Sequence, residues 1–358
     1  MSVIQGSILG PILFLVYIDD LPTSSLLKSF LFADDTQGLK SGKNLGELID
    51  NVNLELVKWA QWFRSNKMAV NTDKTKYLIF HTKGKKIDMN GKKLVFDNND
   101  PMKPFNPSLV YELERIHDNH DNPSSRSYKL LGILFDEHLN FNHHINHLKS
   151  KLSKALFCIN RIKNFVPQKT LKTIYFSLFH SHLLYCPQIV NCSSKTNIEK
   201  IFTMQKKAIR SITNSNYHAH TEPIFSSLKI LPYHKIIYKA QLTFFHSIHN
   251  KYAPSSFSST WKLNSNRNPA YELRNAANYF EPPAKYSFFE KCPLYLLPRA
   301  WNNAGTITCY DNPTTFKIAL NEDLFNKNDE IRPNIPPPPP PTQPPSPPPP
   351  QPPPLPPQ

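Results

Sequence analysis

The chain has 358 residues and a formal net charge of +15. So large a positive excess predicts an anionic partner, and the length allows one large domain or two. Five widely spaced cysteines make no disulfide framework, no apolar run reaches the ~18 residues that a membrane span needs, and no secretory leader is recognisable. We therefore expect an intracellular protein of the nucleus or cytoplasm that is neither secreted nor membrane-bound.

The first predicted element is a helix that begins at residues 10–11, a Gly-Pro pair suited to a helix start, and runs to Ile18. Asp19 and Asp20 follow directly after Tyr17 and Ile18 and imitate the metal-binding box of a polymerase. Negative charge is unfavourable at the C-terminus of a helix, so neither aspartate is predicted to be catalytic.

A second carboxylate pair, Asp34 and Asp35, follows the apolar stretch 30–32 and precedes Gly38. This pattern predicts a strand, a tight turn that carries the carboxylates, and a second strand. Adjacent aspartates repel each other unless a cation neutralises them, and Mg²⁺ or Mn²⁺ suits hard oxygen ligands. Taken alone, the pair is also compatible with a polar hairpin tip.

Between residues 45 and 63, apolar residues recur every three or four positions and predict an amphipathic helix with Trp59 on its buried face. Two short strands are expected at 67–71 and 76–81. From 84 to 127 the periodicity is lost among lysines and clusters of Asn, Asp and Pro, which predicts an insertion loop.

The region 138–198 contains no acidic residue, and its apolar periodicity predicts helices over 141–159 and 171–179, the second with Leu178 on its apolar face. Further helices are expected at 198–212 and 233–248. A helical surface of one sign suits a phosphate backbone, whereas ordinary exposed helices mix signs. The residues that we assign to nucleic-acid binding are Lys149, Lys151, Lys154, Arg161, Lys163 and Lys172.

The C-terminal tail is dominated by proline. Of the 35 prolines in the chain, 18 lie at or after Pro333, so the tail is expected to be disordered with polyproline II character. Such a segment is able to bind the grooves of SH3, WW or profilin-type domains.

Four segments carry a resemblance to a known family: Gln5-Gly6-Ser7, Phe32-Ala33-Asp34-Asp35, Asn71 to Thr75, and Tyr128 to Ile133. In this order and spacing they resemble motifs B, C and D and the primer grip of the reverse transcriptases of non-LTR retrotransposons, the jockey-like LINE group in particular. The likeness extends over roughly residues 2–325. One tetrapeptide would be weak evidence, but four motifs in order form a specific pattern.

The resemblance implies DNA synthesis from an RNA template, a DNA primer and dNTPs, with Mg²⁺ or Mn²⁺ as cofactor. It implies that Asp34 and Asp35 bind the metal and act with Lys74, which would lie near the leaving pyrophosphate. The substrate-binding residues that it implies are Gln5, Gly6, Ser7, Phe32 and Ala33, and the primer-grip residues are Leu131 and Gly132.

The expected fold class is α+β. It comprises a partial right-hand polymerase palm, with the motif B helix, the Asp-Asp hairpin, a palm helix and a primer-grip strand, followed by a mostly α-helical thumb and C-terminal region. The expected boundaries are 1–83 for the palm with motifs B, C and D, 84–127 for the insertion loop, 128–140 for the primer grip, 141–325 for the basic helical region and 326–358 for the disordered tail.

The expected function is that of an RNA-directed DNA polymerase domain of a LINE-like mobile element. The fingers motifs and motif A, which supplies another metal-binding aspartate, have no counterpart in the sequence, so we expect a truncated copy that is inactive alone. Two alternatives stay open: a non-catalytic RNA- or DNA-binding protein derived from a retrotransposon, which the basic helices favour, and a proline-rich scaffold that carries a relic domain.

Overall fold

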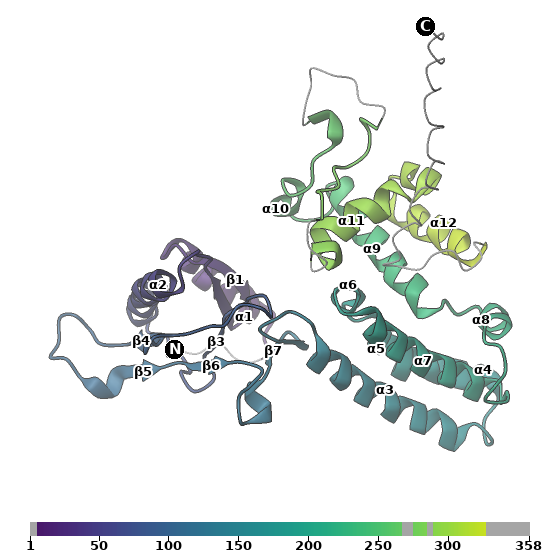
Figure 1. Ribbon diagram of the computed structural model, residues 1–358, viewed down its shortest axis with the longest axis horizontal. Coiled ribbons are helices and arrows are strands. Elements are labelled where there is room, and N and C mark those ends of the chain that lie inside the picture. The colour runs from purple at the N-terminus through teal and green to yellow at the C-terminus, as the bar shows by residue number, and fades with distance from the viewer. Residues whose placement is uncertain (1–5, 267–274, 285–288, 327–358) are drawn as a thin grey trace, which may run out of the picture. The chain divides into compact units, whose positions relative to one another are not determined.

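The computed structural model describes residues 6–266, 275–284 and 289–326 (Figure 1). Gln5 and almost all of the proline-rich tail therefore lie outside the described residues. The chain divides into two compact units, residues 1–144 and 145–358. The division falls inside one long helix, α3.

The first unit mixes helices with very short strands, which pair two by two among its described residues. Strands β1 and β2, β4 and β5, and β7 and β8 form antiparallel pairs, and β3 and β6 form a parallel pair. Its elements are α1 (Leu9–Ile18), η1 (Leu21–Thr23), β1 (Lys28–Phe32), β2 (Asp35–Leu39), α2 (Leu45–Ser65), β3 (Lys76–Leu78), β4 (Val95–Asp97), η2 (Pro107–Leu109), β5 (Val110–Glu112), β6 (Glu114–Ile116), η3 (Pro123–Ser125), β7 (Tyr128–Leu130) and β8 (Ile133–Phe135).

Helix α2 supplies most of the core of this unit. The Asn44 side chain accepts hydrogen bonds from the backbone N–H groups of Gly46 and Glu47 and so starts the helix. The helix buries an apolar face that confirms the predicted periodicity, and both of its tryptophans lie in the core. The buried apolar residues are Ile49, Leu56, Trp59, Ala60, Trp62 and Phe63.

Two expectations for this unit are wrong. Residues 67–71 form no strand, and the strand expected at 76–81 is shortened to β3. The segment 84–127, expected to be loop, contains β4, β5 and β6, and Phe96 and Leu113 from it pack into the core with α2. Strands of three residues are too short to show an alternating pattern, and the turn-forming Asn, Asp and Pro around them hide them further.

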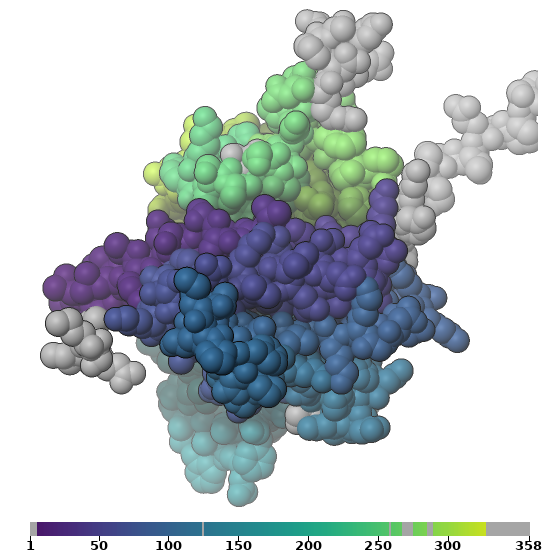
Figure 2. Space-filling model, turned by 90° about the vertical axis from the view of Figure 1, so that its left-hand side faces the viewer, coloured from purple at the N-terminus to yellow at the C-terminus, as the bar shows by residue number. Residues whose placement is uncertain are grey.

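Helix α1 is apolar along its whole length and yet lies at the surface. Only Ile18 is buried, whereas Ile8, just before the helix, is 88% exposed and Val16 is 73% exposed. The N-terminal elements, purple in Figure 2, are at the surface in the face shown there. Helices that are apolar on all sides are normally covered, so α1 has the character of an interface. Within the described residues, no helix combines the length and the apolar character needed to cross a membrane.

The second unit is a bundle of helices around α9. Helix α9 packs against α6, α7, α11 and α12 and carries Phe245, whose ring contacts Trp261, Tyr279 and Trp301. The elements of this unit are α3 (Asn142–Ile162), α4 (Gln168–Ile174), η4 (Tyr175–His180), α5 (Ser181–Leu184), α6 (Pro187–Asn191), α7 (Lys195–Ile212), α8 (Glu222–Leu228), α9 (Tyr233–His249), α10 (Ser255–Ser258), η5 (Asn264–Asn266), η6 (Phe289–Lys291), α11 (Pro293–Asn302), η7 (Gly305–Cys309) and α12 (Pro313–Asn326).

The predicted helix at 171–179 is confirmed, but its buried face differs. Residues 175–180 form a π-helical turn between α4 and α5, which widens the helix to more than four residues per turn. Leu171, Tyr175, Phe179 and Leu183 are therefore buried at intervals of four residues. Leu178, placed on the apolar face by a period of 3.6, is 46% exposed instead.

The start of α3 depends on the buried carboxylate of Asp136, which is fully inaccessible to solvent. Its oxygens accept backbone N–H hydrogen bonds from His138 at 3.1 Å, from Asn140 at 3.0 Å and from Phe141 at 2.7 Å. These bonds hold the loop between β8 and α3, in which Leu139 and Phe141 adopt positive φ angles.

Replacing Asp136 by alanine should lower the free energy of unfolding by about 1.5–3 kcal/mol, because buried N–H groups lose a charged acceptor. Urea unfolding followed by circular dichroism measures the change. Asp121→Ala, which removes an exposed aspartate of the same unit, is the control. Equal unfolding midpoints for the two variants would show that Asp136 does not hold this loop.

Candidate functional site

The Asp34–Asp35 pair lies at the tip of a β-hairpin, as predicted. Strands β1 and β2 pair antiparallel, with Phe32 opposite Asp35, so that Ala33 and Asp34 form a two-residue turn. Ala33 takes a positive φ of 51°, which tight hairpin turns require at their first central residue in the type II′ form. Both aspartates and Phe32 are exposed, the last at 61%.

The hairpin is seated on helix α2. A Cβ atom on Gly38 would lie 2.8 Å from the Trp59 ring and 2.9 Å from Leu27, so only glycine allows β2 to approach the helix this closely. Glu55 of α2 is buried and accepts the Leu26 backbone N–H at 2.6 Å, just before β1 begins. These two contacts hold the strands that carry the aspartates.

Glu55 is ionised in this position. The hydrogen bond from the Leu26 N–H, together with the Lys58 ammonium 3.0 Å away, lowers the pKa of the Glu55 carboxyl below its ordinary value, although burial works in the opposite direction. A charged acceptor beneath the hairpin strengthens the bond to Leu26.

The donor set at the hairpin tip suits a hard divalent cation. Asp34 and Asp35 offer adjacent exposed carboxylates, and within the described part of the chain no Lys, Arg or His forms an ion pair with either. Oxygen ligands with unneutralised charge are those that Mg²⁺ prefers. Two carboxylates supply only part of a coordination shell, so water or a bound phosphate would have to complete it.

The residues before α1 have a local role in starting the helix. Gly6 has a φ of 90°, and the Ser7 hydroxyl accepts the Gly10 N–H at 3.1 Å, so the turn and its serine support the first turn of α1. At the other end, Asp20 accepts the Trp62 indole N–H at 3.1 Å. Asp20 therefore has a structural partner, in keeping with its exclusion from the catalytic set.

Lys74 is exposed on a turn that Asn71 organises. The Asn71 side chain accepts the Lys74 N–H at 3.1 Å, and the Thr75 hydroxyl donates to the Asn71 carbonyl at 2.8 Å. This accounts physically for the Asn and Thr of the motif. No hydrogen bond or ion pair among the described residues joins Lys74 to Asp34 or Asp35.

Leu131 and Gly132 form the two-residue turn between β7 and β8, with φ angles of 46° and 84°. A turn with both φ angles positive favours Asn-Gly, and leucine in the left-handed region costs about 1–2 kcal/mol. Leu131 is also 42% exposed, so neither the backbone conformation nor burial in the core explains why a leucine occupies this position. Strain retained at an exposed position is typical of binding sites.

The basic residues of α3 lie outside its buried face. Ile145, Leu148 and Leu152 are buried, as predicted from their spacing. The four basic residues that the structure exposes on this helix are Lys149, Lys151, Lys154 and Arg161. The other two assigned residues are less open: Lys163 donates to the Asn214 side chain at 3.0 Å, and Lys172 is half-buried on α4.

Sequence reasoning predicted the hairpin that carries Asp34 and Asp35 and the helix that carries the basic residues, but it missed the buried Glu55 and Asp136. Both are acidic residues beside apolar ones, and their sequence neighbours gave no indication that they are buried. Their partners are backbone N–H groups of segments that only the fold brings near them.

No protein-family model and no solved structure matches the chain. The chain does match curated relatives. The chain is 24% identical over 238 residues to the RNA-directed DNA polymerase from mobile element jockey of Drosophila melanogaster, a match that covers 63% of this chain and 23% of the relative. It is 24% identical to the probable RNA-directed DNA polymerase from transposon X-element and 26% identical to that from transposon BS, both of the same fly. It spans about a quarter of the length of these relatives.

Glu55→Gln should destabilise the protein at neutral pH, and the difference from wild type should vanish in acid. Because the folded-state pKa is lowered, the stabilisation is fully present above the unfolded pKa near 4.5 and is lost as the pH falls through the folded pKa. Urea midpoints of both proteins at pH 7 and pH 3.5 measure this. Asp121→Asn, at an exposed position of the same unit, is the control; a Glu55→Gln deficit that is unchanged at pH 3.5 would contradict the account.

Proposed function

We propose that this chain, a distant homologue of the reverse transcriptases of jockey-like non-LTR retrotransposons, provides palm and thumb elements of an RNA-directed DNA polymerase. The observation that carries the proposal is the β1–β2 hairpin, which presents Asp34 and Asp35 exposed and, among the residues that the structure describes, in no ion pair with a basic side chain. Because the curated relatives are polymerases, we assign the two exposed carboxylates to a polymerase metal site.

In the proposed reaction, a primer 3′-hydroxyl attacks the α-phosphate of a dNTP and pyrophosphate leaves. Asp34 and Asp35 would hold Mg²⁺, which stabilises the attacking and leaving oxygens when bound. Lys74 would lie near the pyrophosphate. Gln5, Gly6 and Ser7, with Phe32 and Ala33, would contact the template base and incoming nucleotide.

Leu131 and Gly132 would hold the primer terminus. This role would explain why a leucine is retained at an exposed position with a strained backbone. Helix α3 would act as the thumb and contact the phosphate backbone of the RNA–DNA duplex through its exposed basic residues. A protein recognises a phosphate backbone through its charge, whatever the nucleotide sequence. The absence of acidic residues between Glu137 and Glu199 supports this role, because no carboxylate there would repel the phosphates.

The exposed apolar surface of α1 suggests what else would contribute to the metal site. The curated relatives are about four times as long as their matched segments. We propose that α1 packs against further polymerase sequence of the kind these relatives carry, which would also supply another carboxylate for the metal site.

A second candidate function is RNA or DNA binding without catalysis. The basic face of α3 favours it, because that face requires no metal and is complete within the second unit. Catalysis and binding are separable by the following two experiments.

Asp35 is tested in a chimaera in which this chain replaces the matching segment of the jockey polymerase. The chimaera should extend a primed RNA template with Mg²⁺ and dNTPs, and Asp34→Asn or Asp35→Asn should lower the rate by roughly 100-fold or more, since electrostatic stabilisation is usually the largest contribution to such a step. Asp19→Asn removes an exposed carboxylate at the end of α1 and should leave extension unchanged. Extension that tolerates Asp35→Asn would exclude the hairpin as the metal site.

The thumb assignment is tested by changing Lys149, Lys151, Lys154 and Arg161 together to alanine in the 358-residue chain. Binding to a primer–template should weaken, and each lost phosphate contact should reduce the log–log salt slope by about 0.7–0.9. Fluorescence anisotropy at several salt concentrations measures both quantities.

The matched control removes four exposed lysines of the first unit, Lys83, Lys85, Lys86 and Lys103. It changes the net charge equally and should alter the salt slope much less. If both quadruple variants lose the same affinity, general charge rather than the α3 surface is responsible.

A further inference from the structure

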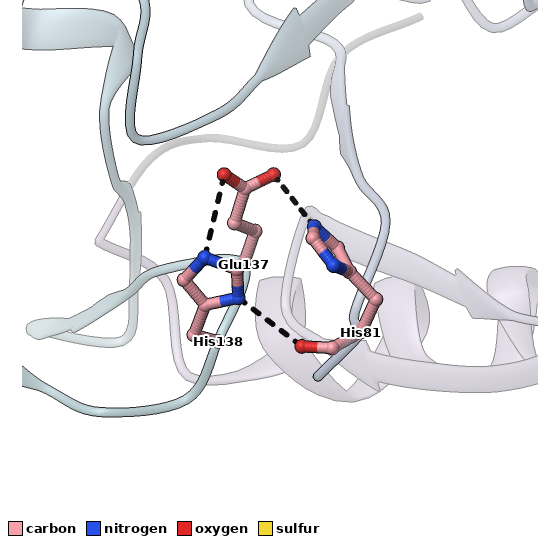
Figure 3. A group of neighbouring side chains, drawn as sticks. All are labelled: His81, Glu137 and His138. Carbon is pink, nitrogen blue, oxygen red and sulfur yellow. Dashed lines mark hydrogen bonds and ion pairs between the residues drawn. The ribbon is translucent and has the colours of Figure 1, made fainter. Parts of the chain in front are cut away.

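A second group of possible metal ligands lies in the first unit, apart from the Asp34–Asp35 hairpin. His81 follows β3, and Glu137 and His138 follow β8, so residues 56 positions apart in sequence meet in space (Figure 3). One potential ligand atom from each residue lies within 4.8 Å of the others. The side chains are between 8% and 15% exposed, so the group is shielded but still reachable from solvent.

The hydrogen bonds of the two histidines determine which nitrogen is free. Nδ1 of His81 lies 3.0 Å from the Thr82 carbonyl oxygen, and Nδ1 of His138 lies 3.1 Å from the His81 carbonyl oxygen. A carbonyl oxygen only accepts, so each Nδ1 must carry the proton and donate. In a neutral ring this leaves the Nε2 atom with its lone pair.

Both Nε2 atoms face the carboxylate of Glu137. Nε2 of His81 is 3.2 Å from Oε2, and Nε2 of His138 is 3.9 Å from Oε1. The Asp118 backbone N–H donates to Oε1 at 3.0 Å and the Arg115 guanidinium lies 3.3 Å from Oε2, so the carboxylate is held in a fixed position. With both rings neutral, two lone pairs and a carboxylate converge on one point, which is the arrangement of donor atoms that a metal ion requires.

The rings of His81 and His138 have centroids 4.7 Å apart, and the Arg115 guanidinium lies 3.3 Å from Glu137 Oε2. A single metal ion satisfies both lone pairs and the anion together.

The geometry suits zinc. Metal bonds of about 2.0–2.2 Å in a tetrahedral site place ligand atoms roughly 3.3–3.6 Å apart. The two histidine Nε2 atoms lie 3.2 Å and 3.9 Å from the Glu137 carboxylate oxygens, so small side-chain movements would bring the three ligands to this spacing. Two histidines and one glutamate form a known zinc ligand set with a fourth position for water. Metal-binding histidines almost always donate their other ring N–H to a carbonyl or carboxylate, as both do here. Arg115 holds the carboxylate in place but its charge opposes a cation.

We propose that His81, Glu137 and His138 bind Zn²⁺ and that the ion fastens the segment after β3 to the end of the β7–β8 hairpin. The site is separate from the Asp34–Asp35 pair and independent of the polymerase proposal. It would fix the hairpin that carries Leu131 and Gly132 relative to the segment that follows Lys74.

The test compares two replacements of one ligand in the purified, chelator-treated 358-residue chain. Gln at position 138 can still donate a hydrogen bond to the His81 carbonyl but is a poor zinc ligand, whereas Cys loses that bond and supplies a thiolate. Calorimetry with Zn²⁺ should give one tight site for wild type, weakened roughly 100-fold or more in His138→Gln and Glu137→Gln. His138→Cys should keep the site.

Cobalt identifies the ligands directly. With Co²⁺, a thiolate-to-cobalt absorption band should appear in His138→Cys in excess of wild type, because position 138 then contributes sulfur. His120→Ala, in the same unit, should leave Zn²⁺ binding unchanged, and circular dichroism confirms that each variant is folded. The proposal fails if wild type binds no Zn²⁺, if the tight site survives both His138→Gln and Glu137→Gln, or if His138→Cys yields no added band.

Discussion

The candidate site depends on the contact between helix α2 and the β1–β2 hairpin. A two-stranded hairpin is marginally stable by itself, so its position must come from packing. Gly38 lets β2 lie against the Trp59 ring, and the buried Glu55 carboxylate holds the backbone at Leu26. With this base fixed, two mutually repelling aspartates can remain at an exposed tip, where a cation is able to reach them.

The sequence predicted the structure best where apolar residues repeat regularly over many positions. The apolar faces of α2 and α3 and the turn at Ala33–Asp34 follow from local pattern and turn chemistry. Strands β4 to β6 were missed because three residues carry no usable period, and Leu178 was misplaced because the π-helical turn alters the spacing. Glu55 and Asp136 could not be found, since an acidic residue appears exposed until its backbone donors from other segments are known.

Charge is distributed differently in the two units. The first holds acidic residues in specific places: the hairpin tip, the support beneath it, and Glu137 between two histidines and Arg115. In the second, α3 presents basic residues without acidic neighbours along its sequence. This division would suit the proposed function, in which carboxylates bind metal and lysine and arginine bind nucleic acid; the homology itself shows only a distant relation to reverse transcriptases of this group.

The central claim is that the hairpin tip is a divalent-metal site. Paramagnetic broadening of amide NMR signals by Mn²⁺, in the presence of primer–template and dNTP, tests it most directly. The account predicts that the strongest broadening centres on residues 33–36 and disappears in the Asp34→Asn, Asp35→Asn double variant. Broadening that is centred elsewhere, or that persists unchanged in the double variant, would contradict it.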